Sequence, residues 1–277
     1  MSFKRTRATL LALAAGLLVG LLQAGASQAA TPTVNIAITT TSGAVTGALE
    51  SGAVNIAVTD TGVKEAAVIL LQLKPGTTPA EAEAVLAAKA GHDPNSASAV
   101  GAIGFDVEAN PGAPTEAMTV LSPAEYMLLV IEGEKPPKVE THFVVKAAKT
   151  PAALPTPAAM ERTIDFGFKG PTTLHDGELV GFENEGYLVH MNVAFPVRNM
   201  KAARAAVKDL LAGRQKALGK LIAGAPVTFA GPVSHGALQE ETIGAKPGIY
   251  VQACFMQTQD GRDHTMLGME RIIKIAK

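Results

Sequence analysis

Short runs rich in Val, Ile, Leu and other apolar residues recur along the chain, and most are too short for helices. They are bounded by Gly, Pro, Asp or Ser, which is typical of strands. The clearest runs are 54–60, 66–73, 126–131, 179–184, 189–195 and 249–255. Their number and spacing predict antiparallel β-sandwiches rather than alternating βαβ units. The expected fold class is therefore all-β.

Two segments interrupt this pattern with a helical period. In residues 200–222, the apolar residues Ala203, Val207 and Leu210 lie three or four positions apart and form one face. Residues 77–91, TTPAEAEAVLAAKAG, are also helix-like and occupy the corresponding place in the first part of the chain. We therefore expect one short inserted helix in each sandwich, packed on an end or a face of the sheets.

A Pro- and Ala-rich stretch, residues 149–160, divides the chain. Each Pro restricts the residue before it and removes a backbone hydrogen-bond donor, so the stretch predicts a linker. It separates a first domain at 31–148 from a second at 161–277, and both are close to the commonest domain size.

The two predicted domains share features at one constant spacing. Gly62 and Gly186 are 124 residues apart, and so are Tyr126 and Tyr250. A helix-like segment lies at the corresponding place in each domain. These coincidences favour a tandem duplication.

The first thirty residues predict a signal peptide rather than part of the fold. Basic residues at Lys4, Arg5 and Arg7 precede an apolar run of fifteen residues and a small-residue segment suited to cleavage near Ala29. The run is short for a membrane span, and no second long apolar run follows. We expect an exported protein, secreted or periplasmic, with no membrane span in the mature chain.

Composition narrows the classes of partner. Without residues 1–30, Lys and Arg fall from 24 to 21 against 25 Asp and Glu, which leaves a net charge of about −4. That charge gives no reason to expect binding to nucleic acid. Cys254 is the only cysteine, so it cannot form an intramolecular disulfide. An inert buried thiol, an intermolecular bridge and a metal or reactive thiolate remain as alternatives.

The surroundings of Cys254 favour a metal ligand. Cys254 ends a predicted strand, His264 follows after nine intervening residues, and Met269 follows after four more. A loop between neighbouring strands brings its two ends together, so the three side chains can converge. A thiolate, an imidazole and a weak thioether are ligands of blue-copper sites, which need a second imidazole. His190, at the start of an earlier strand, is the candidate.

These segments resemble cupredoxins. ENEGYLVHMNV (183–193) is similar to the pattern in which Asn and Gly precede the first copper histidine, and GIYVQAC with HTMLGM (248–254, 264–269) is similar to the pattern that closes the site. The resemblance implies two Greek-key β-sandwich domains. It also implies one copper ion in the second, with His190, Cys254 and His264 as equatorial ligands and Met269 as axial ligand. Gly268 would be the turn glycine. The nine-residue spacing is longer than in small cupredoxins.

The first domain lacks this ligand set. At the spacing of 124, Ala66 replaces the first histidine and Val130 replaces the cysteine, while His142 has no cysteine near it. We therefore expect a degenerate copy without metal. His235 lies in a glycine-containing loop of the second domain and is an alternative candidate for a histidine ligand of the metal.

The function that these residues favour is electron transfer through one copper ion, with an unidentified redox partner protein. No histidine adjoins Cys254, no His-x-His pair occurs, and we expect no enzymatic activity. Two alternatives remain: a metal-free cupredoxin-like binding or structural module, and a Cu(I) carrier in which Met191, Met256 and Met266 assist.

Overall fold

The structure is a computed structural model that describes residues 31–89, 94–133 and 135–277. The predicted signal peptide lies outside the described residues. Residues 31–277 form one compact unit. Below, "first half" means residues 31–148 and "second half" means residues 161–277. Within the described ranges, no helix has the length and apolar character needed to cross a membrane.

Strands dominate both halves, as the apolar runs predict. The first half contains β1 (Thr33–Ile38), β2 (Gly43–Gly47), β3 (Gly52–Asp60), β4 (Ala66–Leu73), α1 (Pro79–Lys89), η1 (Pro94–Ala99), β5 (Gly101–Ala109), β6 (Thr115–Leu121), β7 (Ala124–Glu132) and β8 (Lys138–Val145). The rest comprises β9 (Ala159–Ile164), β10 (Gly167–Lys169), β11 (Thr173–His175), β12 (Leu179–Asn184), β13 (His190–Val197), α2 (Met200–Leu211), α3 (Gln215–Leu218), β14 (Val227–Val233), β15 (Leu238–Thr242), β16 (Gly248–Ala253), η2 (His264–Leu267) and β17 (Glu270–Ala276). The expected all-β class is confirmed.

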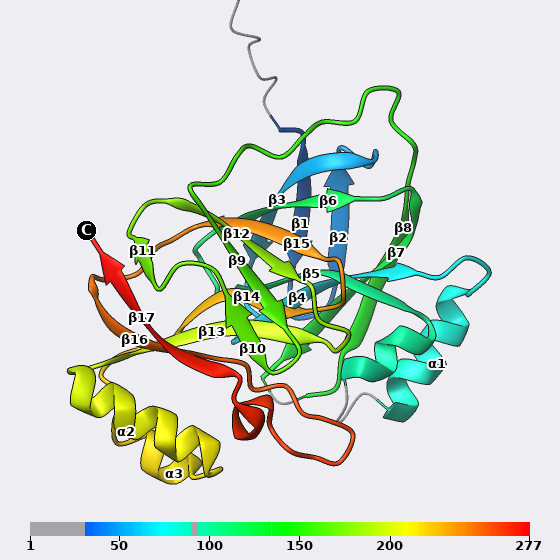
Figure 1. Ribbon diagram of the computed structural model, residues 1–277. Helices are drawn as coiled ribbons and strands as arrows, with labels where there is room; N and C mark the ends of the chain where they lie inside the picture. The colour runs from blue at the N-terminus through cyan, green and yellow to red at the C-terminus, as the bar shows by residue number, and fades with distance from the viewer. Residues whose placement is uncertain (1–30, 90–93, 134) are drawn as a thin grey trace, which may run out of the picture. The chain divides into compact units, whose positions relative to one another are not determined.

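The strands form three sheets (Figure 1). A four-stranded sheet in the first half has the order β5-β4-β7-β8, and a five-stranded sheet in the second half has the order β14-β13-β16-β17-β11. The third sheet contains strands of both halves, in the order β2-β1-β3-β6-β15-β12-β9-β10. The halves meet in it at β6 and β15, which pair antiparallel through Gln239 with Thr119 and Glu240 with Met118.

Equivalent strand pairs in the two halves also share their register. Leu71 opposes Met127 between β4 and β7, and Phe195 opposes Val251 between β13 and β16, 124 residues later in both strands. The hydroxyls of Tyr126 and Tyr250 each donate to the carbonyl four residues upstream. The two tyrosines that correspond in the sequence therefore make the same kind of hydrogen bond in the two halves.

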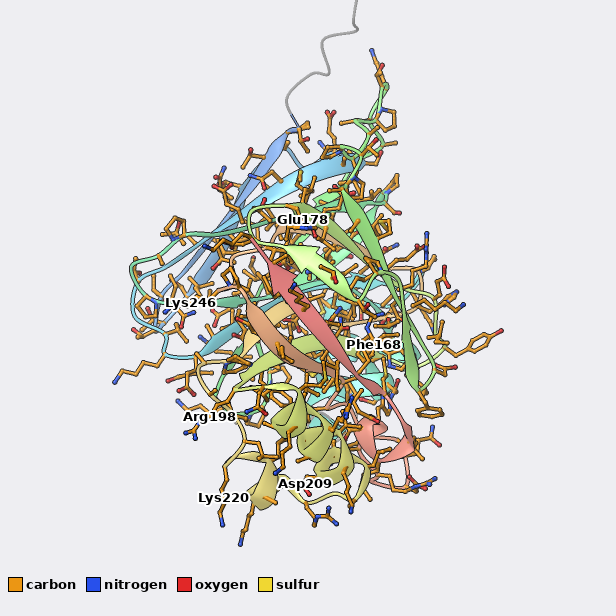
Figure 2. The ribbon with its side chains drawn as sticks, turned by 60° about the vertical axis from the view of Figure 1, so that its left-hand side comes forward. Phe168, Glu178, Arg198, Asp209, Lys220 and Lys246 are labelled. Atoms are coloured by element: carbon orange, nitrogen blue, oxygen red, sulfur yellow. The ribbon has the colours of Figure 1, made fainter. Side chains whose placement is uncertain are left out.

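The inserted helices α1 and α2 are capped by different side chains. Asn199 caps α2, because its side chain accepts from the Ala202 N–H, and α2 packs against β16 and β17 (Figure 1). Asp209 in α2 and Lys220 beyond α3 lie at this end of the second half (Figure 2). At the start of α1, the side chains of Thr78 and Glu81 bond reciprocally to each other's backbone N–H.

The Pro- and Ala-rich stretch is hydrogen-bonded to both halves. The Ala53 N–H donates to the Ala152 carbonyl at 2.9 Å, and the Ala158 N–H donates to the Leu179 carbonyl at 2.8 Å. The first bond lies at the edge of β3 and the second beside β12. The exact domain boundaries stay a prediction.

Candidate metal centre

His190 is the first residue of β13, and the segment before it is held by a buried asparagine. The Asn184 side-chain amide donates to the carbonyls of Leu188 and Val233 at 2.9 and 2.8 Å, and its oxygen accepts from the Gly186 N–H at 2.9 Å. This closes residues 184–188 into a loop that delivers His190 to the start of its strand. The Asn and Gly of the cupredoxin-like pattern thus have a direct structural role.

A carboxylate fixes the orientation of the His190 ring. Asp165 lies in the turn between β9 and β10, and its Oδ1 is 3.0 Å from His190 Nε2. Since an ionised carboxylate only accepts, Nε2 carries the proton and the lone pair is on Nδ1. Gly186 makes room for this bond, because a Cβ there would lie 2.6 Å from both Asp165 Oδ1 and His190 Nε2.

Cys254 and Met269 are joined at the base of the loop between β16 and β17. The Cys254 N–H donates to the Met269 carbonyl at 3.2 Å, and the Met269 N–H donates to the His264 carbonyl at 3.1 Å. Gly268, with φ of 98°, has the left-handed conformation that glycine favours. Cys254, His264 and Met269 are all fully buried.

The nine residues between Cys254 and His264 fold back on themselves. Gln257 and Asp263 form an isolated antiparallel bridge, and the Thr258 N–H donates to the Arg262 carbonyl. The His264 N–H then donates to the Met256 carbonyl at 2.8 Å. The loop therefore returns His264 to the end of β16, and its length does not separate the two side chains.

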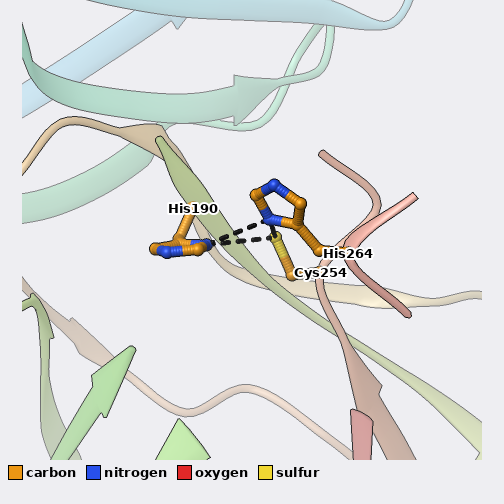
Figure 3. Close-up of side chains that lie close together, drawn as sticks. All are labelled: His190, Cys254 and His264. Carbon is orange, nitrogen blue, oxygen red and sulfur yellow. Dashed lines mark hydrogen bonds between the residues drawn. The ribbon is translucent and has the colours of Figure 1, made fainter. Parts of the chain in front are cut away.

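Three donor atoms converge at the centre of the site (Figure 3). His190 Nδ1 lies 3.2 Å from His264 Nδ1, and Cys254 Sγ lies 3.4 Å from His264 Nδ1 and 3.8 Å from His190 Nδ1. Metal–nitrogen bonds of about 2.0 Å and metal–sulfur bonds of about 2.3 Å, in a trigonal plane, give N···N of about 3.5 Å and N···S of about 3.7 Å. The donors are therefore spaced for one ion.

Burial keeps all three donors uncharged without a metal. It raises the pKa of the Cys254 thiol to about 12, and burial and the nearby His190 ring lower the pKa of His264 to about 4. Burial also lowers the pKa of His190, although Asp165 opposes this. Burial disfavours ionisation of Asp165, but the Leu188 N–H and the His190 ring outweigh it and lower that pKa. The site therefore contains two neutral, buried imidazole rings beside a neutral thiol.

A buried polar network adjoins this cluster in the sheet. The Glu161 carboxylate accepts from Asn192 at 2.9 Å and from Arg271 at 2.6 Å, and it also accepts from Gln252. Asn192 lies two residues after His190 on β13, and Gln252 lies two residues before Cys254 on β16, so these side chains flank the ligands along their strands. Burial raises the pKa of Glu161, while Arg271, Asn192 and Gln252 act to lower it.

Asp165 and the Glu161 network were not found from the sequence. Asp165 lies in a short turn where Asp is common for local reasons, and nothing in its spacing points to His190. Glu161 belongs to no recognisable motif. That Asn192 and Gln252 lie side by side on neighbouring strands becomes clear only when the register of β13 and β16 is known. The sequence does offer one signal for this network, which is the presence of polar residues in strands that are expected to be buried.

Other sequence candidates lie outside the cluster. Within the described residues, His190, Cys254 and His264 form the one group of three or more His, Cys, Asp or Glu side chains whose donor atoms lie within 4.8 Å of one another. His235 stacks on Tyr187 and its Nδ1 lies 2.9 Å from the Gly186 carbonyl oxygen, so it is not a substitute ligand here. The Met191 N–H points at Cys254 Sγ at 3.4 Å, whereas Met266 is exposed.

No family model and no curated protein matches this chain. Three solved structures illustrate the similarity of fold. Auracyanin A, a "blue" copper protein from Chloroflexus aurantiacus, is 16% identical over 42% of this chain and 96% of its own, with a TM-score of 0.25. A multicopper oxidase is 11% identical over 88% of both chains, with a TM-score of 0.24. The copper nitrite reductase of Thermus scotoductus SA-01 is 12% identical over 88% of this chain and 67% of its own, with a TM-score of 0.25.

The expectation that the chain has no enzymatic activity is wrong. The multicopper oxidase and the nitrite reductase described above, which each match over 88% of this chain, are enzymes. The expectation rested on the lack of a histidine next to Cys254 and of a His-x-His pair. Those absences exclude one arrangement of a second copper cluster, and they do not exclude catalysis. The similarity is of fold and assigns no reaction to this chain.

Proposed function

We propose that this protein is an exported cupredoxin-like copper protein that transfers electrons through one copper ion in its second half. His190, Cys254 and His264 would hold the ion, with Met269 as the weak axial ligand. The observation that carries the proposal is the convergence of two imidazole Nδ1 atoms and one thiol sulfur at 3.2–3.8 Å in a fully buried site.

The donor set favours copper over other common ions. Thiolate and imidazole together suit copper and zinc, while a His₂Cys plane with a distant thioether is typical of copper electron-transfer sites. A copper ion held there supplies a one-electron couple between Cu(II) and Cu(I). The protein's own contribution is to exclude water, to keep the Nδ1 lone pairs directed inward and to resist rearrangement of the ligands.

The alternatives are less consistent with the burial of the site. A Cu(I) carrier exchanges its ion with a partner and benefits from accessible ligands, whereas His190, Cys254, His264 and Met269 are each fully buried. A metal-free module needs no convergence of three uncharged donors. Its buried His264 Nε2, which has no hydrogen-bond partner among the described residues, would bring only a desolvation cost.

The remaining parts of the proposal concern organisation and location. We infer that the two halves are copies of one cupredoxin-like unit, supported by their equal strand order and register. The first copy has Ala66 and Val130 in its apolar core and is taken to bind no copper. Residues 1–30 support export, and a redox partner protein is required for electron transfer.

Titration of the metal-free protein with Cu(II) tests this proposal. We expect uptake of one equivalent and an intense visible band from thiolate-to-copper charge transfer. Cys254→Ser should abolish the band, and His235→Ala should keep it, since His235 is a nearby histidine outside the cluster. Stoichiometric uptake by the parent protein without a coloured species, or an unchanged band in Cys254→Ser, would contradict the proposal.

A further inference from the structure

An apolar cavity of about 350 Å³ lies between the two halves, and none of the four candidate copper ligands lines it. Its floor is the face of the four-stranded sheet that carries Ile69, Leu71 and Leu129, and Leu86 of α1 contributes one wall. Phe255 and Met256 of the second half complete it. Its volume lies in the range of small-molecule sites, and its lining is mostly hydrophobic as in such sites.

One carboxyl group interrupts this apolar lining. Asp106, on β5, is 2% exposed, and its Oδ2 has no hydrogen-bond partner among the described residues. A buried carboxyl without a partner is costly, so it indicates a missing partner. Burial, with a contribution from Glu108, raises the pKa of Asp106 well above its usual value.

The surroundings of Asp106 are shaped to accept this side chain. The Asp106 N–H donates to Gln239 Oε1 at 2.7 Å, and Gln239 Nε2 donates back to the Asp106 carbonyl at 3.1 Å. Gly231 of β14 leaves space for the carboxyl, because a Cβ there would lie 2.3 Å from Asp106 Oδ1. Two strands of the second half therefore position a carboxyl of the first.

Asp106 also lines a second, acidic cavity of about 190 Å³. Glu108 and Glu241 contribute carboxyl groups to it, and Thr228 and Asn110 contribute neutral polar groups. Burial raises the pKa of Glu241 to about 8, and the nearby Asp106 and Glu108 add to this effect. In the described part of the chain, neither cavity is lined by Lys, Arg or His. A ligand that is cationic at one end and apolar at the other therefore matches the two cavities.

The spacing of the carboxyl groups separates an organic cation from a metal ion. Outside the metal centre, no three described His, Cys, Asp or Glu side chains bring donor atoms within 4.8 Å of one another. A bare divalent ion needs such convergence, because its oxygen ligands lie at about 2.0–2.6 Å. An ammonium group donates hydrogen bonds of about 2.8 Å and tolerates wider spacing.

We propose that the two cavities form one binding site for a small amphiphilic amine, a primary alkylammonium ion with its head group at Asp106 and its apolar chain against Ile69, Leu71 and Leu129. The site contains no candidate copper ligand and adds a ligand-binding function to the protein. The ammonium group completes the hydrogen bonding of Asp106 Oδ2, and the alkyl chain leaves water for the larger cavity.

Isothermal titration of the metal-free protein with hexylamine, hexan-1-ol and hexanoate tests the head group on an unmutated site. We expect hexylammonium to bind with one-to-one stoichiometry, hexan-1-ol to bind about tenfold or more weakly, and hexanoate to bind weakest of the three. Equal binding of amine and alcohol, stronger binding of hexanoate, or no binding of hexylammonium would each overturn the proposal. Using metal-free protein separates this result from the copper titration.

Two variants locate the site. Asp106→Asn should weaken hexylammonium binding by about tenfold or more and leave hexan-1-ol within about twofold. The matched control is Asp60→Asn, since Asp60 is also a buried aspartate with an unpartnered Oδ2, and it should leave both affinities unchanged. Ala67→Leu, which narrows the apolar cavity, should weaken both ligands. Equal loss of hexylammonium in the Asp106 and Asp60 variants would contradict the assignment.

Discussion

The two halves have the same strand order but fill equivalent positions differently. At the spacing of 124, His190 and Cys254 of the second half correspond to Ala66 and Val130 of the first, which lie in an apolar core. Between β7 and β8 the first half has five residues, whereas between β16 and β17 the second half has sixteen. The candidate metal centre therefore lies in the half that has both the ligand side chains and a loop long enough to carry a second imidazole.

The difference extends to the residues that flank the ligands. The register places Glu161 at the position of Ile36, Asn192 at that of Val68, and Gln252 at that of Leu128. The three residues of the first half belong to its hydrophobic core. The second half thus replaces part of an apolar core by a buried polar network next to its metal centre.

The largest expected effect comes from giving Cys254 the side chain of its counterpart. Cys254→Val removes the sulfur ligand, and we expect complete loss of the copper–thiolate band because no other thiol exists in the chain. The free energy of unfolding of the metal-free protein should change by less than about 1.5 kcal/mol, because the position stays apolar and similar in size. Visible spectroscopy and urea denaturation measure the two effects. A copper–thiolate band that persists in Cys254→Val would contradict the assignment of Cys254 as the sulfur ligand.

The second test breaks the polar network. Glu161→Ile leaves the Arg271 guanidinium without its carboxylate partner, and we expect a loss of about 3–5 kcal/mol in the free energy of unfolding. The fourfold variant that adds Asn192→Val, Gln252→Leu and Arg271→Thr also removes the two buried amides and the guanidinium charge, and it should recover most of that loss. Denaturant titration of both metal-free variants is the measurement. A single variant as stable as the parent would show that the network is not a linked unit.

The third test concerns the turn that orients His190. In the first half the equivalent turn closes on itself through Thr39 and Ser42, whereas in the second half it directs Asp165 to His190. Asp165→Ala should lower copper affinity by about 10–100-fold, because the ring loses the acceptor that fixes its tautomer. Asp165→Asn retains an acceptor oxygen and should recover part of the affinity. Competition with a copper chelator measures this, and equal affinity in all three proteins would contradict the role.

The last test concerns a dependence of stability on pH at the junction of the halves. Glu241 corresponds to Ala117 of the first half, and its pKa is raised from 4.5 to about 8 in the folded protein. Between these values the unfolded chain loses the proton and the folded protein keeps it. Glu241 should therefore contribute a fall in the free energy of unfolding as pH rises, by at most about 1.4 kcal/mol per pH unit.

Glu241→Gln removes this titration. Its stability, measured by urea denaturation at about pH 5 and about pH 7.5, should decrease less than that of the parent protein over the same interval. The remaining dependence reports on the other shifted groups, such as Asp106 and Glu270, whose pKa values burial raises, and His264, whose pKa burial lowers. A Glu241→Gln variant that loses as much stability as the parent protein over this interval, or more, would contradict the predicted sign.

Much of the fold could be predicted because strand length, turn residues and apolar runs are local properties of the sequence. The candidate metal ligands could be proposed for a similar reason, since Cys254, His264 and Met269 lie on one loop and only His190 is distant. Asp165, Glu161 and Asp106 were not predictable, because their roles depend on register and on contacts between segments far apart in sequence. The expectation about enzymatic activity failed because it treated two missing motifs as an exclusion.

The pairing of β6 with β15 has a consequence for the half without the metal ligands. An unpaired sheet edge presents free N–H and C=O groups and invites association with other chains. On its own, the second half would expose β15 as such an edge, together with Gln239 and Glu240, which are buried in the intact protein. In the intact chain the first half covers this edge of β15, and having Ala66 and Val130 in place of the candidate ligands does not affect that role.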